Sequence, residues 1–143
     1  MTSDRAQVVV IPCSGIGKTY GSVAREAAYD LCEDLRPAST RLVALAKLVL
    51  GEEEARELVR ACPVVTIDGC KLMCASTLVA LSGGAVAHEV AVLDVYKRHR
   101  DLKPDGIAEL NEGGRKLARV LAEEVAHVID EMQARTPAGG QHA

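Results

Sequence analysis

Short apolar runs that alternate with helical patterns are the feature that most constrains the fold. Residues 7–12 and 64–68 are rich in β-branched side chains, as buried strands are, and each run is followed by a glycine-containing turn and a helical pattern. Because the chain contains no Phe and no Trp, aliphatic side chains must fill its core. The alternation predicts an α/β fold, namely a single-domain three-layer sandwich with a mainly parallel, Rossmann-like sheet.

The boundaries of the elements follow from apolar periodicity and from the positions of Pro and Gly. Helices are expected at about 22–35, 52–62, 70–82 and 105–132, and a long strand at 86–95. The segment 41–46 is either a further strand or, with residues 47–50, part of a helix. Gly113-Gly114 marks either close backbone packing or a break in the last helix. The domain is expected to span residues 1–135, and residues 136–143 are expected to form a disordered tail.

The charge pattern and the lengths of the apolar runs exclude several partners. The net charge is −3 with no basic stripe, and aromatic residues make up only 2% of the chain, so nucleic-acid binding is not expected. The longest apolar runs, Val8–Pro12 and Leu42–Ala46, are far too short to span a membrane, and the N-terminus does not resemble a signal peptide. We therefore expect a cytoplasmic protein, whose five cysteines serve as metal ligands, reactive thiols or core residues.

Three of the five cysteines are predicted to meet at one edge of the sheet. Cys13 directly follows the first strand and Cys70 follows the strand at 64–68, and the carboxyl ends of parallel strands lie at the same edge. Cys74 lies one turn after Cys70 in the expected helix, where Cβ atoms four residues apart are about 5–6 Å from each other. Two sulfur atoms at this spacing can bind one zinc ion at about 2.3 Å each. The helix N-terminus expected at Cys70 also favours the thiolate, which is the form that binds metal.

The remaining candidate residues are assigned by their place in the expected elements. Cys32 lies on the apolar face of its helix, and Cys62 lies at the amino end of a strand and hence at the opposite edge, so both are assigned to core packing. A fourth zinc ligand must come from elsewhere. His99, just past the last expected strand, ranks above Asp94 as that ligand. Both rank below a water molecule or an external thiol.

The glycine-rich segment after the first strand resembles a phosphate-binding loop only in part. Gly17-Lys18-Thr19 ends like a P-loop, but Pro12 occupies the position of the required first glycine. The segment can still present backbone N–H groups to an anion, or it can simply form a tight turn. A small anion or a small thiol therefore remains open as a ligand.

Two motifs carry a resemblance to a known family. The segment Ile67-Asp68-Gly69-Cys70-Lys71-Leu72-Met73-Cys74 resembles the signature of the DGC-domain family. Members also carry a Cys-Ser-Gly at the end of their first strand, which Cys13-Ser14-Gly15 resembles. The resemblance extends from about Val8 to the last helix.

The resemblance implies zinc as the cofactor and does not imply an enzymatic reaction. Carried over to this chain, it marks Cys13, Cys70 and Cys74 as the ligands. Many members have Pro after the Asp-Gly-Cys cysteine, where this chain has Lys71. Some members have a further cysteine in the first loop, but Ile16 follows Cys-Ser-Gly here, so that thiolate is absent.

Thiolates at helix N-termini also suit functions other than zinc binding. A thiol redox or sulfur-carrier enzyme would use Cys70 as its reactive thiolate and Cys74 or Cys13 as the resolving thiol. Soft thiolates bind iron–sulfur clusters as well. The sequence leaves the choice among these functions, the substrate and the oligomeric state open.

Overall fold

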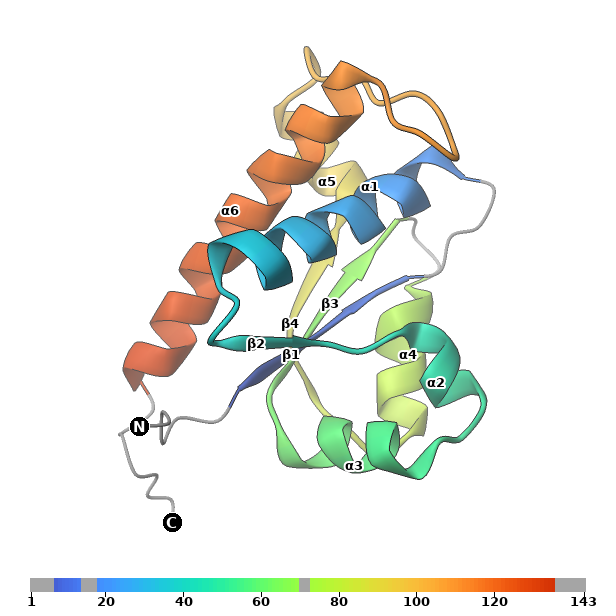
Figure 1. Ribbon diagram of the computed structural model, residues 1–143, viewed down its shortest axis with the longest axis vertical. Coiled ribbons are helices and arrows are strands. Elements are labelled where there is room, and N and C mark those ends of the chain that lie inside the picture. The colour runs from blue at the N-terminus through green and yellow to red at the C-terminus, as the bar shows by residue number, and fades with distance from the viewer. Residues whose placement is uncertain (1–6, 14–17, 70–72, 136–143) are drawn as a thin grey trace.

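A four-stranded parallel sheet organises the described part of the chain. The computed structural model describes residues 7–13, 18–69 and 73–135. Within these residues the strands lie in the order β2-β1-β3-β4, and every neighbouring pair is parallel (Figure 1). The strands are β1 (Val8–Pro12), β2 (Thr40–Leu42), β3 (Val64–Asp68) and β4 (Val86–Ala91). The predicted α/β fold with a parallel sheet is confirmed.

Helices cover both faces of this sheet (Figure 1). The helices are α1 (Thr19–Tyr29), α2 (Leu45–Val49), α3 (Glu53–Ala61), α4 (Cys74–Leu81), α5 (Val92–Arg98) and α6 (Glu112–Arg135), and a π-helical segment η1 (Asp30–Leu35) extends α1. Helix α1 packs on β1 and β3 and is itself covered by α6, whereas α4 packs on β3 and β4. The buried core between these layers consists mostly of aliphatic side chains, with Val10, Ile67 and Leu121 completely buried.

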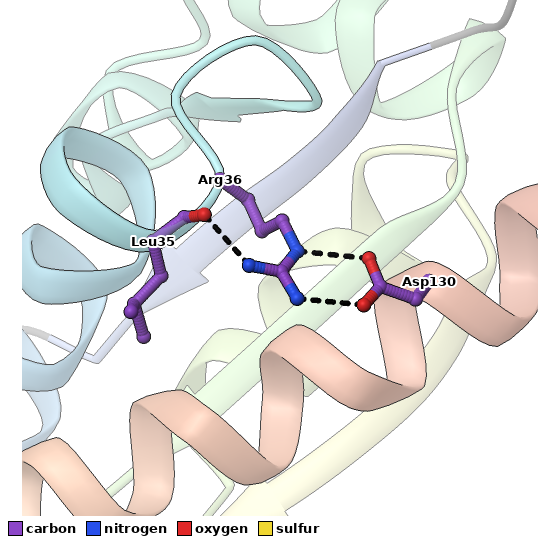
Figure 2. Close-up of polar contacts among 3 residues, drawn as sticks. All are labelled: Leu35, Arg36 and Asp130. Atoms are coloured by element: carbon purple, nitrogen blue, oxygen red, sulfur yellow. Dashed lines mark hydrogen bonds and ion pairs between the residues drawn. The ribbon is translucent and has the colours of Figure 1, made fainter.

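An arginine fixes the turn between η1 and β2 to the last helix. The Arg36 guanidinium donates two hydrogen bonds to the Asp130 carboxylate on α6, at 2.8 and 2.6 Å, and a third to the Leu35 carbonyl at 2.7 Å (Figure 2). The guanidinium lowers the pKa of Asp130 below its ordinary value through this hydrogen bonding. Because both side chains are partly exposed, at 30% and 48%, the pair orients the two segments more than it stabilises the fold.

Several predicted boundaries are confirmed and others are wrong. The segment 41–50 contains both alternatives, since β2 ends at Leu42 and α2 begins at Leu45. The helix expected from residue 70 begins at Cys74 instead, because Met73 before it adopts a left-handed conformation with φ of 53°. Cys70 itself lies outside the described residues, as does the tail at 136–143. None of the helices in the described ranges is long and apolar enough to cross a bilayer.

The prediction of one long strand at 86–95 is wrong in its second half. Strand β4 ends at Ala91, and α5 begins at Val92. Val92 and Val95 are three residues apart and both buried, which is the spacing of one helix face. The apolar residues of this segment therefore serve a strand and then a helix.

The last helix begins later than predicted. Helix α6 starts at Glu112, and the side chain of Asn111 accepts hydrogen bonds from the N–H groups of Asp105 and Gly114, at 2.9 and 2.7 Å. The bond from Asp105 holds the segment before α6 in an irregular turn instead of a helix, and the bond from Gly114 caps the first turn of α6. A Cβ atom at Gly113 would lie 2.5 Å from the Lys103 carbonyl oxygen, so the Gly-Gly pair marks close packing and not a break.

Candidate functional site

Cys13 lies at the carboxyl edge of the sheet and is tied to the turn after β3. Its backbone N–H donates to the Ile67 carbonyl oxygen at 2.9 Å, which continues the pairing of β1 with β3 one residue further. Its side chain is only 6% exposed, and the Gly69 N–H donates to its Sγ at an N–S distance of 3.0 Å. The sulfur of Cys13 is therefore in contact with the residue that precedes Cys70.

Gly69 is the point where three segments meet. A Cβ atom at this position would lie 2.9 Å from the Gly21 nitrogen and 2.9 Å from the Tyr20 carbonyl carbon, both in the first turn of α1. Real Cβ atoms do not approach backbone atoms this closely, so only glycine fits without a shift. The glycine of the Asp-Gly-Cys motif thus lets the turn after β3 reach both α1 and the sulfur of Cys13.

Asp68 fixes the start of α4. This aspartate is 1% exposed, and its Oδ1 accepts the Ala75 N–H at 2.8 Å while its Oδ2 accepts the Ser76 hydroxyl at 3.4 Å. The Ser76 hydroxyl also bonds to Thr66 Oγ1 at 2.7 Å. A carboxylate that accepts a free N–H group in the first turn of a helix acts as its cap. Asp68 therefore holds the beginning of α4, and with it Cys74, against the end of β3.

The environment of Asp68 works against its charged form. Burial raises the pKa of Asp68 above the ordinary value of 3.8 and outweighs the hydrogen bonds from Ala75 and Ser76, which lower it, while Glu89 on β4 raises it further. A carboxyl group whose pKa is raised on folding contributes most to stability below pH 3.8, and it loses that contribution as the pH rises through the folded-state pKa. Its capping hydrogen bonds offset only part of this cost at neutral pH.

We expect Asp68→Ala to be less stable than Asp68→Asn at every pH, because only asparagine keeps an oxygen that can cap α4. The alanine variant loses the cap and should lower the free energy of unfolding by about 1–2 kcal/mol at neutral pH. The asparagine variant keeps an oxygen for the Ala75 N–H without the buried charge, so its stability relative to wild type should rise from about pH 4 upward. Urea unfolding at several pH values measures this. Equal destabilisation of both variants at every pH would contradict the capping role.

Cys74 is the first residue of α4 and is exposed. It lies on the carboxyl side of β3, as predicted, but its position comes from the Asp68 cap and not from one continuous helix turn after Cys70. The predicted set of three thiolates includes Cys70, so it cannot be assembled from the described residues alone.

Cys32 and Cys62 lie where core residues were predicted. Cys32 in η1 and Cys62 at the end of α3 are partly buried against the hydrophobic core. Burial is the main cause that raises the pKa of each thiol above the ordinary value of 9.0. Cys62 precedes β3 at its amino end, so it lies at the edge opposite to Cys13. Thiols that stay protonated at neutral pH are poor metal ligands.

His99 lies at the end of α5 and faces α6. Its Nε2 is 3.7 Å from Glu124 Oε2, next to the two hydrogen bonds that Arg98 donates to the same carboxylate. Asp94 lies on α5 as well, and not on a strand. Among the described residues no group of three or more His, Cys, Asp or Glu side chains is arranged to hold a metal ion. The structure therefore does not bring His99 together with Cys13 and Cys74.

The sequence reasoning missed the roles of Asp68 and Gly69. Both belong to the Asp-Gly-Cys motif, and their contacts in the structure are with Ala75 and with α1. Asp68 lies six residues before the first residue of α4, so it is not at the N-cap position that local sequence signals identify. The close approach of Gly69 to Tyr20 and Gly21 has no local signal.

Comparison with known sequences places this arrangement in a family. No match was found among curated proteins, and none among solved structures. The sequence model of the DGC domain matches residues 9–113, which run from β1 to the first turn of α6 and include Cys13 and the Asp-Gly-Cys turn. Since this match covers more than half of the chain, the protein belongs to the DGC-domain family.

Proposed function

We propose that this chain binds one zinc ion through the thiolates of Cys13, Cys70 and Cys74. The observation that carries the proposal is the hydrogen bond from the Gly69 N–H to Cys13 Sγ, because it joins the end of β1 to the residue before Cys70. An N–H donor also stabilises negative charge on sulfur, and the thiolate is the form that binds metal.

The chemistry of the donors fits zinc. Cys13 at the end of β1 is buried, and Cys74, which follows β3, is exposed. Zinc in proteins takes four ligands, with sulfur atoms at about 2.3 Å, so three thiolates leave one position for water or an external thiol. Bound there, zinc would supply a Lewis-acid centre with one exchangeable position.

A cytoplasmic location agrees with the state of the cysteines. In the described ranges, Cys32, Cys62 and Cys74 are free thiols. Free thiols persist in the reducing conditions of the cytoplasm, where they serve as ligands or reactive groups more often than as cross-links. We include this compartment in the proposal.

A thiol redox or sulfur-carrier reaction at Cys70 is the second candidate. The hydrogen bond at Cys13 stabilises a thiolate with or without a metal ion, and the exposure of Cys74 lets a small reagent reach the site. An iron–sulfur cluster would use the same thiolates. The three functions predict different contents of the purified protein, so one measurement separates them.

Elemental analysis of the untagged protein, purified without oxygen, should find about one zinc ion per chain. The protein should be colourless, since zinc has no redox chemistry or visible absorption, and the thiols that react with a chromogenic reagent should increase after zinc is removed by a chelator. A brown protein that contains iron would favour the cluster. All five thiols reactive from the start, with no metal, would favour the thiol enzyme.

A further inference from the structure

The first turn of α1 supports the turn that carries Gly69. A Cβ atom at Gly69 would lie 2.9 Å from the Gly21 nitrogen and 3.0 Å from the Tyr20 carbonyl oxygen, so the two backbones are in contact. The N–H of the same glycine donates to Cys13 Sγ. Gly69 is therefore held by the first turn of α1 and by Cys13 together, and a movement of α1 away from it removes one of these two supports.

The first turn of α1 has little stability of its own. Its N-cap residue is Lys18, whose side chain makes no capping hydrogen bond, and the turn contains no acidic residue. A cation at this end of a helix opposes the helix dipole, and the missing cap leaves free N–H groups without a side-chain acceptor. Gly21 within the turn also disfavours a helix relative to alanine. Contacts with other parts of the molecule must therefore hold this turn in place.

Two such contacts come from the chain that follows β4. The Tyr20 ring lies against the Tyr96 ring of α5, with centroids 6.3 Å apart and planes inclined by 42°, which is a favourable arrangement of two aromatic rings. The Ser22 hydroxyl donates to the carbonyl oxygen of Ile107, 85 positions later in the chain. Ser22 is only 7% exposed, and its oxygen also accepts from Arg25 Nη2 at 3.2 Å, which orients the hydroxyl.

Ile107 belongs to the segment 99–111, which connects α5 to α6 and which we call the strap (Figure 1). The base of the strap is fixed by Asn111, whose side chain donates to the Lys103 carbonyl at 3.1 Å and accepts the Asp105 N–H at 2.9 Å. Its tip is different, because Ile107 is 51% exposed and reaches α1 through its carbonyl oxygen. A contact that rests on one hydrogen bond, with little apolar burial, can open without unfolding of the domain.

We propose that Ser22 is a positioning residue for the metal site, and that the strap which it holds controls how fast the metal is released. With the strap closed, the first turn of α1 stays against Gly69, and the Gly69 N–H stays at Cys13 Sγ. With the strap open, the first turn loosens and Gly69 moves. Because Gly69 precedes Cys70, its movement also displaces a second zinc ligand. This inference rests on the zinc site of the proposed function.

Hydrogen exchange of the Gly69 amide, followed by NMR, measures the contact directly. In Ser22→Ala this amide should exchange about fivefold faster than in the wild type, because the net contribution of one hydrogen bond changes a local opening equilibrium by about this factor. Release of zinc to a chelator should accelerate by a similar factor. The exchange is measured on the zinc-loaded and on the chelator-treated protein. Absence of zinc would thus contradict the proposed function while the Gly69 amide still decides the positioning role.

Thr40→Val is the matched control. Thr40 is buried to a similar degree, at 5% exposed, and its hydroxyl also donates to a backbone carbonyl, that of Arg36, at 2.7 Å. It lies at the amino end of β2, whereas Cys13 follows the carboxyl end of β1. This variant should lose global stability, seen in the slowest amides of β1 and β3, without a selective change at Gly69.

A change on the strap itself separates its effect from that of Arg25, which also loses an acceptor in Ser22→Ala. Asn111→Ala loosens the base of the strap and should accelerate exchange at Gly69. In the Ser22→Ala background it should add little, because the tip is already released.

Four results would overturn the proposal. The first is unchanged Gly69 exchange in Ser22→Ala, and the second is an equal acceleration in Thr40→Val. The third is a fully additive effect of Asn111→Ala in the Ser22→Ala background, since the strap would then not act through Ser22. The fourth is faster Gly69 exchange in Ser22→Ala with an unchanged rate of zinc release, which would separate the strap from the metal.

Discussion

Replacing Cys70 with serine should abolish tight zinc binding and leave the fold in place. The same result is expected for Cys74→Ser, because loss of one thiolate from a set of three leaves too few soft ligands for zinc. Cys74 is exposed, so its replacement removes no buried packing. Zinc content by elemental analysis, measured together with far-UV circular dichroism and thermal unfolding, checks both parts of the expectation.

The matched controls are the two cysteines that the zinc proposal does not use. Cys32→Ala and Cys62→Ala should keep the full zinc content and should lower the free energy of unfolding by about 1–3 kcal/mol through lost packing. The Cys70 and Cys74 variants should therefore change the zinc content, whereas the Cys32 and Cys62 variants should change the free energy of unfolding. Loss of zinc in Cys32→Ala with the fold intact, or full zinc content in Cys70→Ser, would contradict the assignment of the ligands.

Gly69→Ala should lower both the stability of the fold and the affinity for zinc. The added Cβ atom would lie 2.9 Å from backbone atoms of Tyr20 and Gly21, which cannot move as a flexible side chain can. We expect a loss of stability of about 1–3 kcal/mol or more, the usual range for overpacking in a tight site. Because the turn after β3 must shift, the hydrogen bond from the N–H of residue 69 to Cys13 Sγ should also be lost. The affinity for zinc should then fall as well.

Gly51→Ala separates these two effects. Gly51 has φ of 72°, so alanine is strained there, but the nearest atom to its Cβ would be 4.0 Å away. It should cost about 1 kcal/mol of stability with no change in zinc affinity. If Gly69→Ala behaved in the same way as Gly51→Ala in both stability and zinc content, the turn after β3 would not be holding the site.

The central strands could be predicted because local signals agree there. The runs that form β1 and β3 are rich in β-branched residues and are bounded by Pro or Gly. Their composition and the residues that end them therefore both indicate a strand. Their parallel pairing then places Cys13 and the Asp-Gly-Cys turn at one edge by geometry alone. This part of the candidate site follows directly from the order of elements.

The end of β4 could not be predicted because one apolar run serves two elements. Val86 to Val95 has apolar residues at spacings that fit either period, and the change to a helix at Val92 depends on burial against the rest of the molecule. A strand that continued to Val95 would have placed His99 at the edge of the sheet, but His99 lies at the end of α5. There it faces Glu124 on α6, a partner twenty-five residues later in the chain.

The contacts of the Asp-Gly-Cys turn are likewise set by distant residues. Gly69 approaches Tyr20 and Gly21, which lie almost fifty positions earlier, and no local pattern encodes that distance. The role of Asp68 is more local, since Ala75 is seven residues away. It was hidden because α4 was expected to begin at Cys70, which would have left no room for a cap between the two.

X-ray absorption at the zinc edge tests the three-thiolate site most directly. The zinc-loaded protein, in a buffer free of thiols, should show three sulfur neighbours at about 2.3 Å and one lighter neighbour, nitrogen or oxygen, at about 2.0–2.2 Å. Addition of a small thiol should replace the lighter neighbour with a fourth sulfur. Four sulfur neighbours in the thiol-free buffer would contradict the account and make Cys32 or Cys62 a ligand, and a site with fewer than three sulfur neighbours would contradict it as well.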